Sequence, residues 1–131
     1  MARILIIEDN PANMKLASLL LRHAGHLVLC AVNAETGLTL ARSSRPDLIM
    51  MDIRLPGMDG LAATALLKQD PVTAAIPVIA LTALAMKDDQ DRSRAAGCDA
   101  YIAKPLRYQP LYDTIDALLA RSPPSDIDPF A

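Results

Sequence analysis

Near the amino terminus the chain reads Ile4-Leu5-Ile6-Ile7-Glu8-Asp9-Asn10-Pro11. Its four consecutive aliphatic residues predict a β-strand that is covered on both faces, as in a parallel sheet. Asn-Pro then predicts the start of a helix, with Asn10 as the capping residue and Pro11 at the first helical position. Two adjacent carboxylates, Glu8 and Asp9, therefore stand where a buried strand gives way to a helix. Their position indicates a chemical role that the rest of the chain must explain.

The same change from an apolar run to a helical pattern recurs along the whole chain. The predicted strands are Arg3–Glu8, Leu27–Ala31, Leu48–Asp52, Val78–Thr82 and Ala100–Ala103. Helical patterns follow from about Pro11, Asn33, Leu61 and Lys87, and a last one carries an apolar stripe of Leu111, Ile115, Leu118 and Leu119. Five strand–helix pairs with short connections predict an α/β fold, in which one parallel sheet is covered by helices on both faces.

Two details of the helices are expectations about packing. The first helix, about Pro11–Ala24, is expected to carry on one face four residues at helical spacing: Leu16, Leu19, Leu20 and His23. In the second helix, Gly37 costs about 1 kcal/mol relative to alanine. The sequence offers no chemical reason for that glycine.

The composition is that of one folded domain. The chain has 131 residues, of which 52% are hydrophobic and 21% are charged, and this balance excludes a disordered chain. We expect a folded domain over 1–121 and a flexible proline-rich tail, or the stub of a linker, over 122–131. No apolar run approaches the roughly 20 residues of a membrane span, so membrane insertion is not expected.

Charge and cysteine usage narrow the function classes further. Thirteen basic and 15 acidic residues give a net charge of −2 without a basic block. Direct nucleic-acid binding is not expected, because phosphate contacts need clustered basic side chains. Cys30 and Cys98 lack metal-ligand spacing. We expect both to be small buried side chains of a protein in the reducing cytoplasm.

Polar residues follow four of the five predicted strands. Glu8 and Asp9 follow the first strand, and Asp52, Thr82 and Lys104 stand at the ends of the third, fourth and fifth. Because sites in open parallel sheets form beyond the carboxyl ends of the strands, these side chains are expected to meet at one edge. Carboxylates 4 Å apart repel by about 4 kcal/mol per pair at an effective dielectric constant near 20, so the cluster takes up protons or a cation.

The chemistry of this cluster indicates phosphoryl transfer. An all-oxygen site without histidine or cysteine suits Mg²⁺, which completes its shell with water and phosphate oxygens. Lys104 and Thr82 add an ammonium group and a hydroxyl group that can bind phosphate oxygens. Positioning and charge neutralisation supply most of the catalysis in phosphoryl transfer. Glu8 and Asp9 are therefore predicted to be part of a metal site.

From Arg3 to about Arg121 the sequence resembles the receiver domain of bacterial two-component response regulators. Thirty positions separate Asp52 from Thr82, and 22 separate Thr82 from Lys104; both intervals are typical of that family. The matching motifs are Glu8-Asp9-Asn10, Met51-Asp52-Ile53-Arg54-Leu55-Pro56-Gly57-Met58-Asp59-Gly60, Leu81-Thr82-Ala83 and Tyr101-Ile102-Ala103-Lys104-Pro105. The resemblance implies a flavodoxin-like doubly wound sheet of five strands in the order 2-1-3-4-5.

The resemblance also implies a role for each matching residue. Asp52 corresponds to the phosphoacceptor, and Asp9, Asp52 and the backbone carbonyl of Arg54 to Mg²⁺ ligands, with Glu8 acting through water and Mn²⁺ as an alternative ion. Lys104, the Thr82 hydroxyl and the backbone N–H of Ala83 correspond to groups that meet the phosphoryl group. Tyr101 corresponds to an aromatic switch that rotates inward as Thr82 moves, and Lys104-Pro105 to a cis peptide.

The implied function is signalling rather than enzymatic turnover. A histidine kinase or a histidine phosphotransfer protein would phosphorylate the domain, which helps its own phosphorylation and dephosphorylation. A downstream protein would then read the surface of the fourth helix, fifth strand and fifth helix. We expect Met86, Lys87, Tyr101 and Tyr108 to contribute to that surface. The start of the fourth helix, residues 85–89, also fits an exposed surface that has no functional role. The protein is expected to be a monomer or a weak dimer.

Narrower and competing interpretations remain open. Asn13-Met14-Lys15-Leu16, Ala85-Met86-Lys87 and Gly97-Cys98-Asp99-Ala100-Tyr101-Ile102 resemble the DivK-like single-domain regulators. A receiver domain excised from a longer response regulator or hybrid histidine kinase is the alternative. A phosphatase of the haloacid dehalogenase type would need a second carboxylate where Arg54 stands. A flavodoxin-like nucleotide binder would need a glycine-rich anion loop in place of Glu8-Asp9.

Overall fold

The computed structural model describes residues 2–82 and 87–121, in which strands and helices alternate. The strands are β1 (Arg3–Ile7), β2 (Leu27–Ala31), β3 (Leu48–Asp52), β4 (Val78–Thr82) and β5 (Ala100–Ala103). The helices are α1 (Pro11–His23), α2 (Ala34–Ser44), α3 (Gly60–Gln69), α4 (Lys87–Ala96) and α5 (Tyr108–Arg121). All strand pairs are parallel, in the order β2-β1-β3-β4-β5. The predicted fold class and strand order are confirmed.

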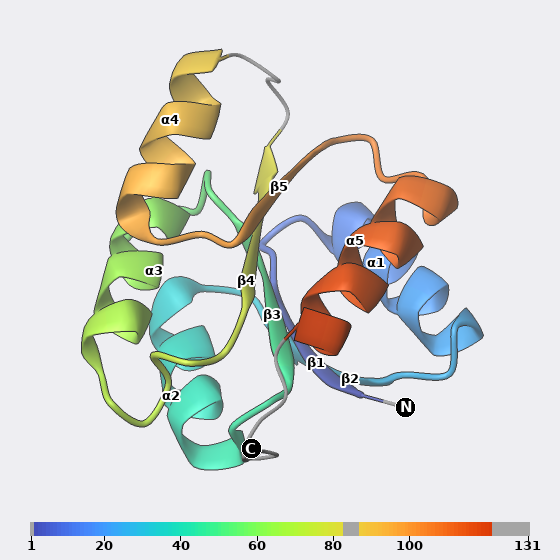
Figure 1. The fold of residues 1–131 in the computed structure, drawn as a ribbon, viewed down its shortest axis with the longest axis horizontal. Helices are drawn as coiled ribbons and strands as arrows, with labels where there is room; N and C mark the ends of the chain where they lie inside the picture. The colour runs from blue at the N-terminus through green and yellow to red at the C-terminus, as the bar shows by residue number, and fades with distance from the viewer. Residues whose placement is uncertain (1, 83–86, 122–131) are drawn as a thin grey trace.

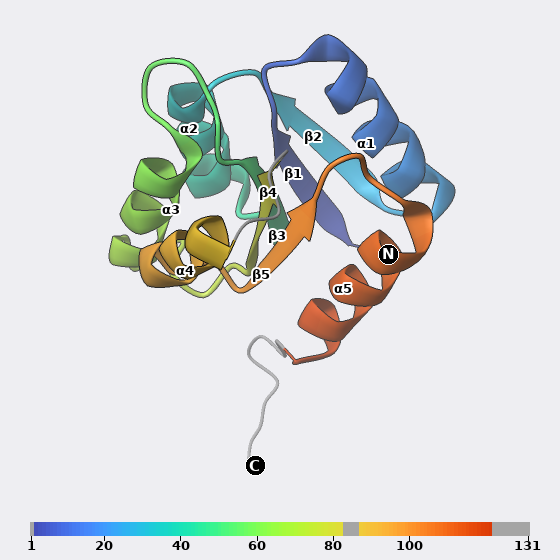
Figure 2. The same ribbon diagram turned by 90° about the horizontal axis from the view of Figure 1, so that it is seen from above.

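The sheet separates two apolar layers. Helices α1 and α5 cover one face, and α2, α3 and α4 lie on the other (Figure 1 and Figure 2). Ile4 and Ile6 point into the α1–α5 layer, whereas Leu5 and Ile7 point into the layer of α2 and α3. None of these four side chains is exposed. The unbroken aliphatic run of β1 therefore supplies both cores, as its pattern predicted.

Helix α1 does not pack on the sheet through the face that carries Leu16, Leu19 and His23. Ala17 and Leu21 are buried, whereas Leu16 and Leu19 are 39% and 56% exposed, and His23 is also exposed. The face that Leu16, Leu19 and His23 share is therefore not the one that packs on the sheet. The helix carries leucines around more than one side, and the small Ala17 lets it approach the sheet more closely than a row of leucines would.

Gly37 is explained by close packing between α2 and β1. A Cβ atom at this position would overlap the Ile7 side chain, lying 2.7 Å from its Cγ1. The side chain of Ile7 is fully buried, so it has little room to move. The intrinsic cost of glycine in a helix is therefore offset by an approach that alanine would block.

Both cysteines are free thiols. Cys98 is partly buried, and burial raises the pKa of its thiol. Cys30 is exposed, so the expectation that both cysteines are buried is wrong. The reason is topological: β2 is an edge strand of the sheet. Among the described helices, none is long and apolar enough to cross a membrane.

Candidate functional site

Four strand ends deliver the predicted polar side chains to one edge of the sheet. Glu8 directly follows β1, Asp52 and Thr82 end β3 and β4, and Lys104 follows β5. The parallel register aligns these ends, since Ile7 pairs with Met51, Asp52 with Leu81 and Thr82 with Ala103. The edge is closed by a hydrogen bond of 2.6 Å from the Lys104 N–H to the Thr82 carbonyl oxygen.

Three carboxylates form the acidic part of this edge. Glu8, Asp9 and Asp52 each offer one carboxylate oxygen, and these three oxygens lie within 4.8 Å of one another. Glu8 and Asp52 are buried, whereas Asp9 is exposed. The Asn10 N–H donates to Glu8 Oε2 at 3.1 Å, and the Asn10 side chain caps α1. The start of α1 thus holds one carboxylate inward and leaves its neighbour facing solvent.

Lys104 is the cation of the site. Its Nζ donates to Glu8 Oε1 at 2.8 Å and to Asp52 Oδ2 at 3.1 Å. The ammonium group therefore bridges two carboxylates that come from different strands. The peptide bond between Lys104 and Pro105 is cis, as the resemblance implied.

Burial and pairing shift the pKa values of this group in ways that can be traced to their causes. Burial raises the pKa of Glu8, and the neighbouring Asp52 raises it further, although the hydrogen bond from Lys104 lowers it. Burial lowers the pKa of Lys104, but its hydrogen bonds to Glu8 and Asp52 outweigh this and raise the pKa overall. Lys104 consequently remains an ammonium ion at neutral pH.

Two backbone features that orient Asp52 were missed by sequence reasoning. The N–H of Arg54 donates to Asp52 Oδ1 at 2.9 Å, so both oxygens of Asp52 have donors. Gly60, the first residue of α3, packs directly on the backbone of Asp52, and a Cβ there would overlap the Asp52 carbonyl oxygen. The sequence does carry a signal for this approach. Gly60 directly follows the capping residue Asp59, and a glycine at such a position allows another backbone to come close.

The remaining predicted residues fall into different groups. Thr82 is fully buried and hydrogen-bonded to Tyr101. Ala83 and Met86 lie outside the described residues, and the role of the Arg54 carbonyl stays a prediction. Tyr108 is 62% exposed, as expected of a surface residue. Asp89, whose position in the sequence also fits plain exposed surface, is only 6% exposed, because the first turn of α4 faces the protein at this position.

The sequence from residue 4 to residue 116 matches the family model described as the response regulator receiver domain. The chain belongs to this family. The receiver domain is 47% identical to the polar-differentiation response regulator DivK of Brucella anthropi over 116 residues, which cover 88% of this chain and 94% of that protein. The family match disfavours the phosphatase and nucleotide-binder interpretations.

Solved structures resemble the receiver domain over nearly its whole length. The receiver domain of the sensor histidine kinase PA1611 from Pseudomonas aeruginosa has a TM-score of 0.85 and 33% identity, with 91% of this chain and 98% of that one covered. That structure has a magnesium ion coordinated in its active site cleft. A CheY-like receiver domain protein from Methanospirillum hungatei has a TM-score of 0.85 and 29% identity, covering 93% and 96% of the two chains.

The donor set of the receiver domain fits a hard divalent cation. The three clustered side chains offer only carboxylate oxygens, which Mg²⁺ prefers over nitrogen or sulfur. Two of these carboxylates are buried, and the single ammonium group of Lys104 does not balance three negative charges. A divalent cation at this edge would neutralise the remaining charge.

Lys104→Met tests this charge balance. We expect the metal-free variant to lose about 3 kcal/mol of stability at neutral pH, because two buried carboxylates lose their cation. The pKa of Glu8 is higher in the folded protein than its ordinary value of 4.5. The free energy of unfolding therefore falls as the pH rises from 4.5 through the raised pKa, because the folded protein must give up a proton that it holds more tightly than the unfolded chain does. The loss in the variant should therefore be larger at neutral than at acidic pH. Urea unfolding at both pH values, with and without Mg²⁺, measures it.

The matched control is Lys68→Met. Lys68 is a similarly buried lysine that pairs with Asp99, at 3.0 Å, away from the acidic cluster. Mg²⁺ should narrow the stability difference between Lys104→Met and the unsubstituted protein, and it should leave the corresponding difference for Lys68→Met unchanged. Equal effects of Mg²⁺ on both variants would contradict the assignment.

Proposed function

We propose that this receiver domain accepts a phosphoryl group on Asp52 from a phosphohistidine of a histidine kinase or a histidine phosphotransfer protein. The observation that carries the proposal is the Lys104 ammonium group bridging Glu8 and Asp52 beside a third carboxylate. This arrangement combines a nucleophilic carboxylate, a cation for phosphate oxygens and oxygen ligands for a metal. We expect a signalling domain that assists its own phosphorylation and dephosphorylation.

The residues of the edge have separable tasks in the proposed reaction. An oxygen of Asp52 attacks phosphorus, the P–N bond to the imidazole breaks as the P–O bond forms, and the imidazole keeps the electron pair of the broken bond. The Arg54 N–H holds the carboxylate in place. Lys104 moves its hydrogen bond from Asp52 to the new phosphoryl oxygens, and the Thr82 hydroxyl turns toward the same group.

The proposed metal ligands are Asp9, Asp52 and the Arg54 carbonyl, with Glu8 reaching the ion through water. A bound Mg²⁺, or Mn²⁺ in its place, would neutralise charge that develops on the phosphoryl oxygens. Support comes from the clustered carboxylates and from the related PA1611 receiver domain, which holds magnesium.

The proposed output is a phosphorylation-dependent contact with a downstream protein. Thr82 lies between the phosphoacceptor edge and Tyr101, to which it is hydrogen-bonded, and this supports a change on the surface of α4, β5 and α5. The similarity to the polar-differentiation response regulator DivK, over 94% of that relative, supports a signalling role. We further propose that the protein is cytoplasmic, which the two free thiols support, and that it acts as a monomer or weak dimer.

Labelling with a small acyl phosphate tests the proposed function. Incubation with acetyl phosphate and Mg²⁺ should add one phosphoryl group, and reductive trapping followed by peptide mass spectrometry should place it on Asp52. Chelation of the metal should prevent the reaction. Label that forms equally well without a divalent cation, or that maps to a hydroxyl or imidazole side chain, would refute the proposal.

A further inference from the structure

One buried carboxylate has no assigned task in the site. Asp89 lies in the first turn of α4 and is 6% exposed. Its Oδ1 faces the Arg92 guanidinium group at 3.7 Å, whereas its Oδ2 is buried without a hydrogen-bond partner. A buried acceptor that lacks a donor is costly, and a charged one more so. Such an atom needs a physical explanation.

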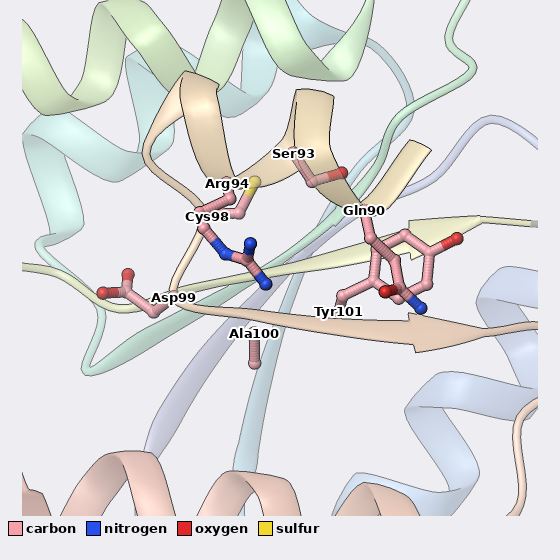
Figure 3. A pocket seen from close by; sticks show the side chains of 7 residues that line it. All are labelled: Gln90, Ser93, Arg94, Cys98, Asp99, Ala100 and Tyr101. Atoms are coloured by element: carbon pink, nitrogen blue, oxygen red, sulfur yellow. The ribbon is translucent and has the colours of Figure 1, made fainter. Parts of the chain in front are cut away.

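Tyr101 on β5 lies within electrostatic reach of this carboxylate. Partial burial raises the pKa of Tyr101, and the charge of Asp89 raises it further, while the hydrogen bond with Thr82 lowers it. The Tyr101 hydroxyl is therefore influenced by Thr82 and by Asp89. Figure 3 shows Tyr101 beside α4, where it lines a cavity of about 280 Å³ together with Ser93 and Gln90.

The proposed rotation of Thr82 would alter the hydrogen bonding of Tyr101. A threonine hydroxyl has one O–H, so a Thr82 that donates to a phosphoryl group would no longer donate to the Tyr101 hydroxyl. In the described part of the chain, the buried side-chain atoms without a partner are Asp89 Oδ2 and Ser93 Oγ, one helical turn apart. A phenol O–H is a donor, and its bond to a carboxylate is stronger than its bond to a neutral hydroxyl.

We propose that Asp89 is a positioning residue whose Oδ2 accepts the Tyr101 hydroxyl when Thr82 turns toward phosphorylated Asp52. The inference rests on the proposed function and adds the acceptor that holds Tyr101 in the phosphorylated state. It satisfies a buried oxygen that the unphosphorylated structure leaves unpaired. Phosphorylation would thereby fix β5 to the first turn of α4, since the new bond joins these two elements.

The test uses the whole chain labelled with 3-fluorotyrosine, with beryllofluoride and Mg²⁺ as the phosphoryl mimic. In the unsubstituted protein the ¹⁹F signal of Tyr101 should shift on binding. In Asp89→Ala that shift should fall by more than half, and beryllofluoride should bind about tenfold more weakly, because a hydrogen bond to a charged group is lost. Asp89→Asn keeps an acceptor oxygen and should recover part of both effects.

Asp91→Ala is the matched control, since Asp91 lies on the same helix with a side chain that is 55% exposed and pairs with Arg94. It should behave like the unsubstituted protein. If Asp89→Ala fails to fold, Tyr101→Phe provides the second variant. It should weaken beryllofluoride binding by the same factor of about ten, and unchanged affinity would overturn the inference.

The bound beryllofluoride has its own ¹⁹F signal, which separates the two proposals. If that signal appears and Tyr101 shifts equally with and without Asp89, the role of Asp89 is refuted while the proposed function stands. If that signal never appears in the unsubstituted protein, the proposed function fails and this inference fails with it. A bound signal with a Tyr101 shift that depends on Asp89 supports both.

Discussion

Asp52→Asn is expected to abolish phosphoryl labelling and to leave the fold intact. The amide oxygen of asparagine cannot form the acyl phosphate, so labelling by acetyl phosphate should fall below detection. The same amide oxygen can still accept the Arg54 N–H that now bonds Asp52 Oδ1. The amide nitrogen that replaces Oδ2 cannot accept from Lys104, but Lys104 keeps its bond to Glu8 and the repulsion between two buried carboxylates is removed. These effects offset each other, so stability should change by less than about 1 kcal/mol. Peptide mapping after labelling and urea unfolding measure the two effects.

Asp59→Asn is the matched control for this substitution. Asp59 is an exposed carboxylate that caps α3 by accepting the Ala62 N–H at 2.8 Å, and asparagine caps a helix equally well. Labelling of Asp59→Asn should match that of the unsubstituted protein. Undiminished label in Asp52→Asn, at any residue, would show that Asp52 is not the acceptor.

Gly60→Ala is expected to cause the largest loss of stability among single-methyl additions near the site, about 3 kcal/mol. The added Cβ would lie 2.7 Å from the Ile53 Cα and would overlap the Asp52 carbonyl oxygen. Because both obstacles are backbone atoms, no side-chain rotation relieves the overlap. Chemical unfolding measures the loss, and labelling should also slow because α3 must shift Asp52 to make room.

Gly25→Ala separates this overlap from the ordinary cost of replacing glycine. Gly25 has a φ of +91° and no atom within 4 Å of an added Cβ. Its substitution should cost only the strain of a left-handed residue, about 1–2 kcal/mol, and should not affect labelling. A loss in Gly60→Ala no greater than that in Gly25→Ala would contradict the packing argument.

Most of the fold was predictable because the chain carries strong local signals. Strands β2 to β5 have the predicted bounds, and β1 ends one residue earlier, at Ile7. The capping residues Asn10 and Asn33 accept the N–H groups expected of them. The face of α1 was not predictable in the same way, because its leucines surround the helix and only packing against the sheet selects Ala17 and Leu21.

The candidate site was predictable for a different reason. Parallel strands end at a common edge, so the order of residues along the chain was enough to gather Glu8, Asp52 and Lys104. Asp89 was not found, because its burial depends on how α4 sits against the sheet. A charged helix start has the same sequence pattern whether it faces solvent or the protein interior.

The amino-acid order alone determined the element sequence, the parallel sheet and the edge at which carboxylates and lysine meet, since these follow from local periodicity and from strand direction. Only the tertiary structure decided which atoms touch. It showed that Gly37 packs closely on the Ile7 side chain, that Gly60 packs closely on the Asp52 backbone, and that one oxygen of Asp89 is left unpaired. These facts depend on distances between atoms of different elements, and a local pattern does not give such distances, even where, as at Gly60, a glycine signals a close approach.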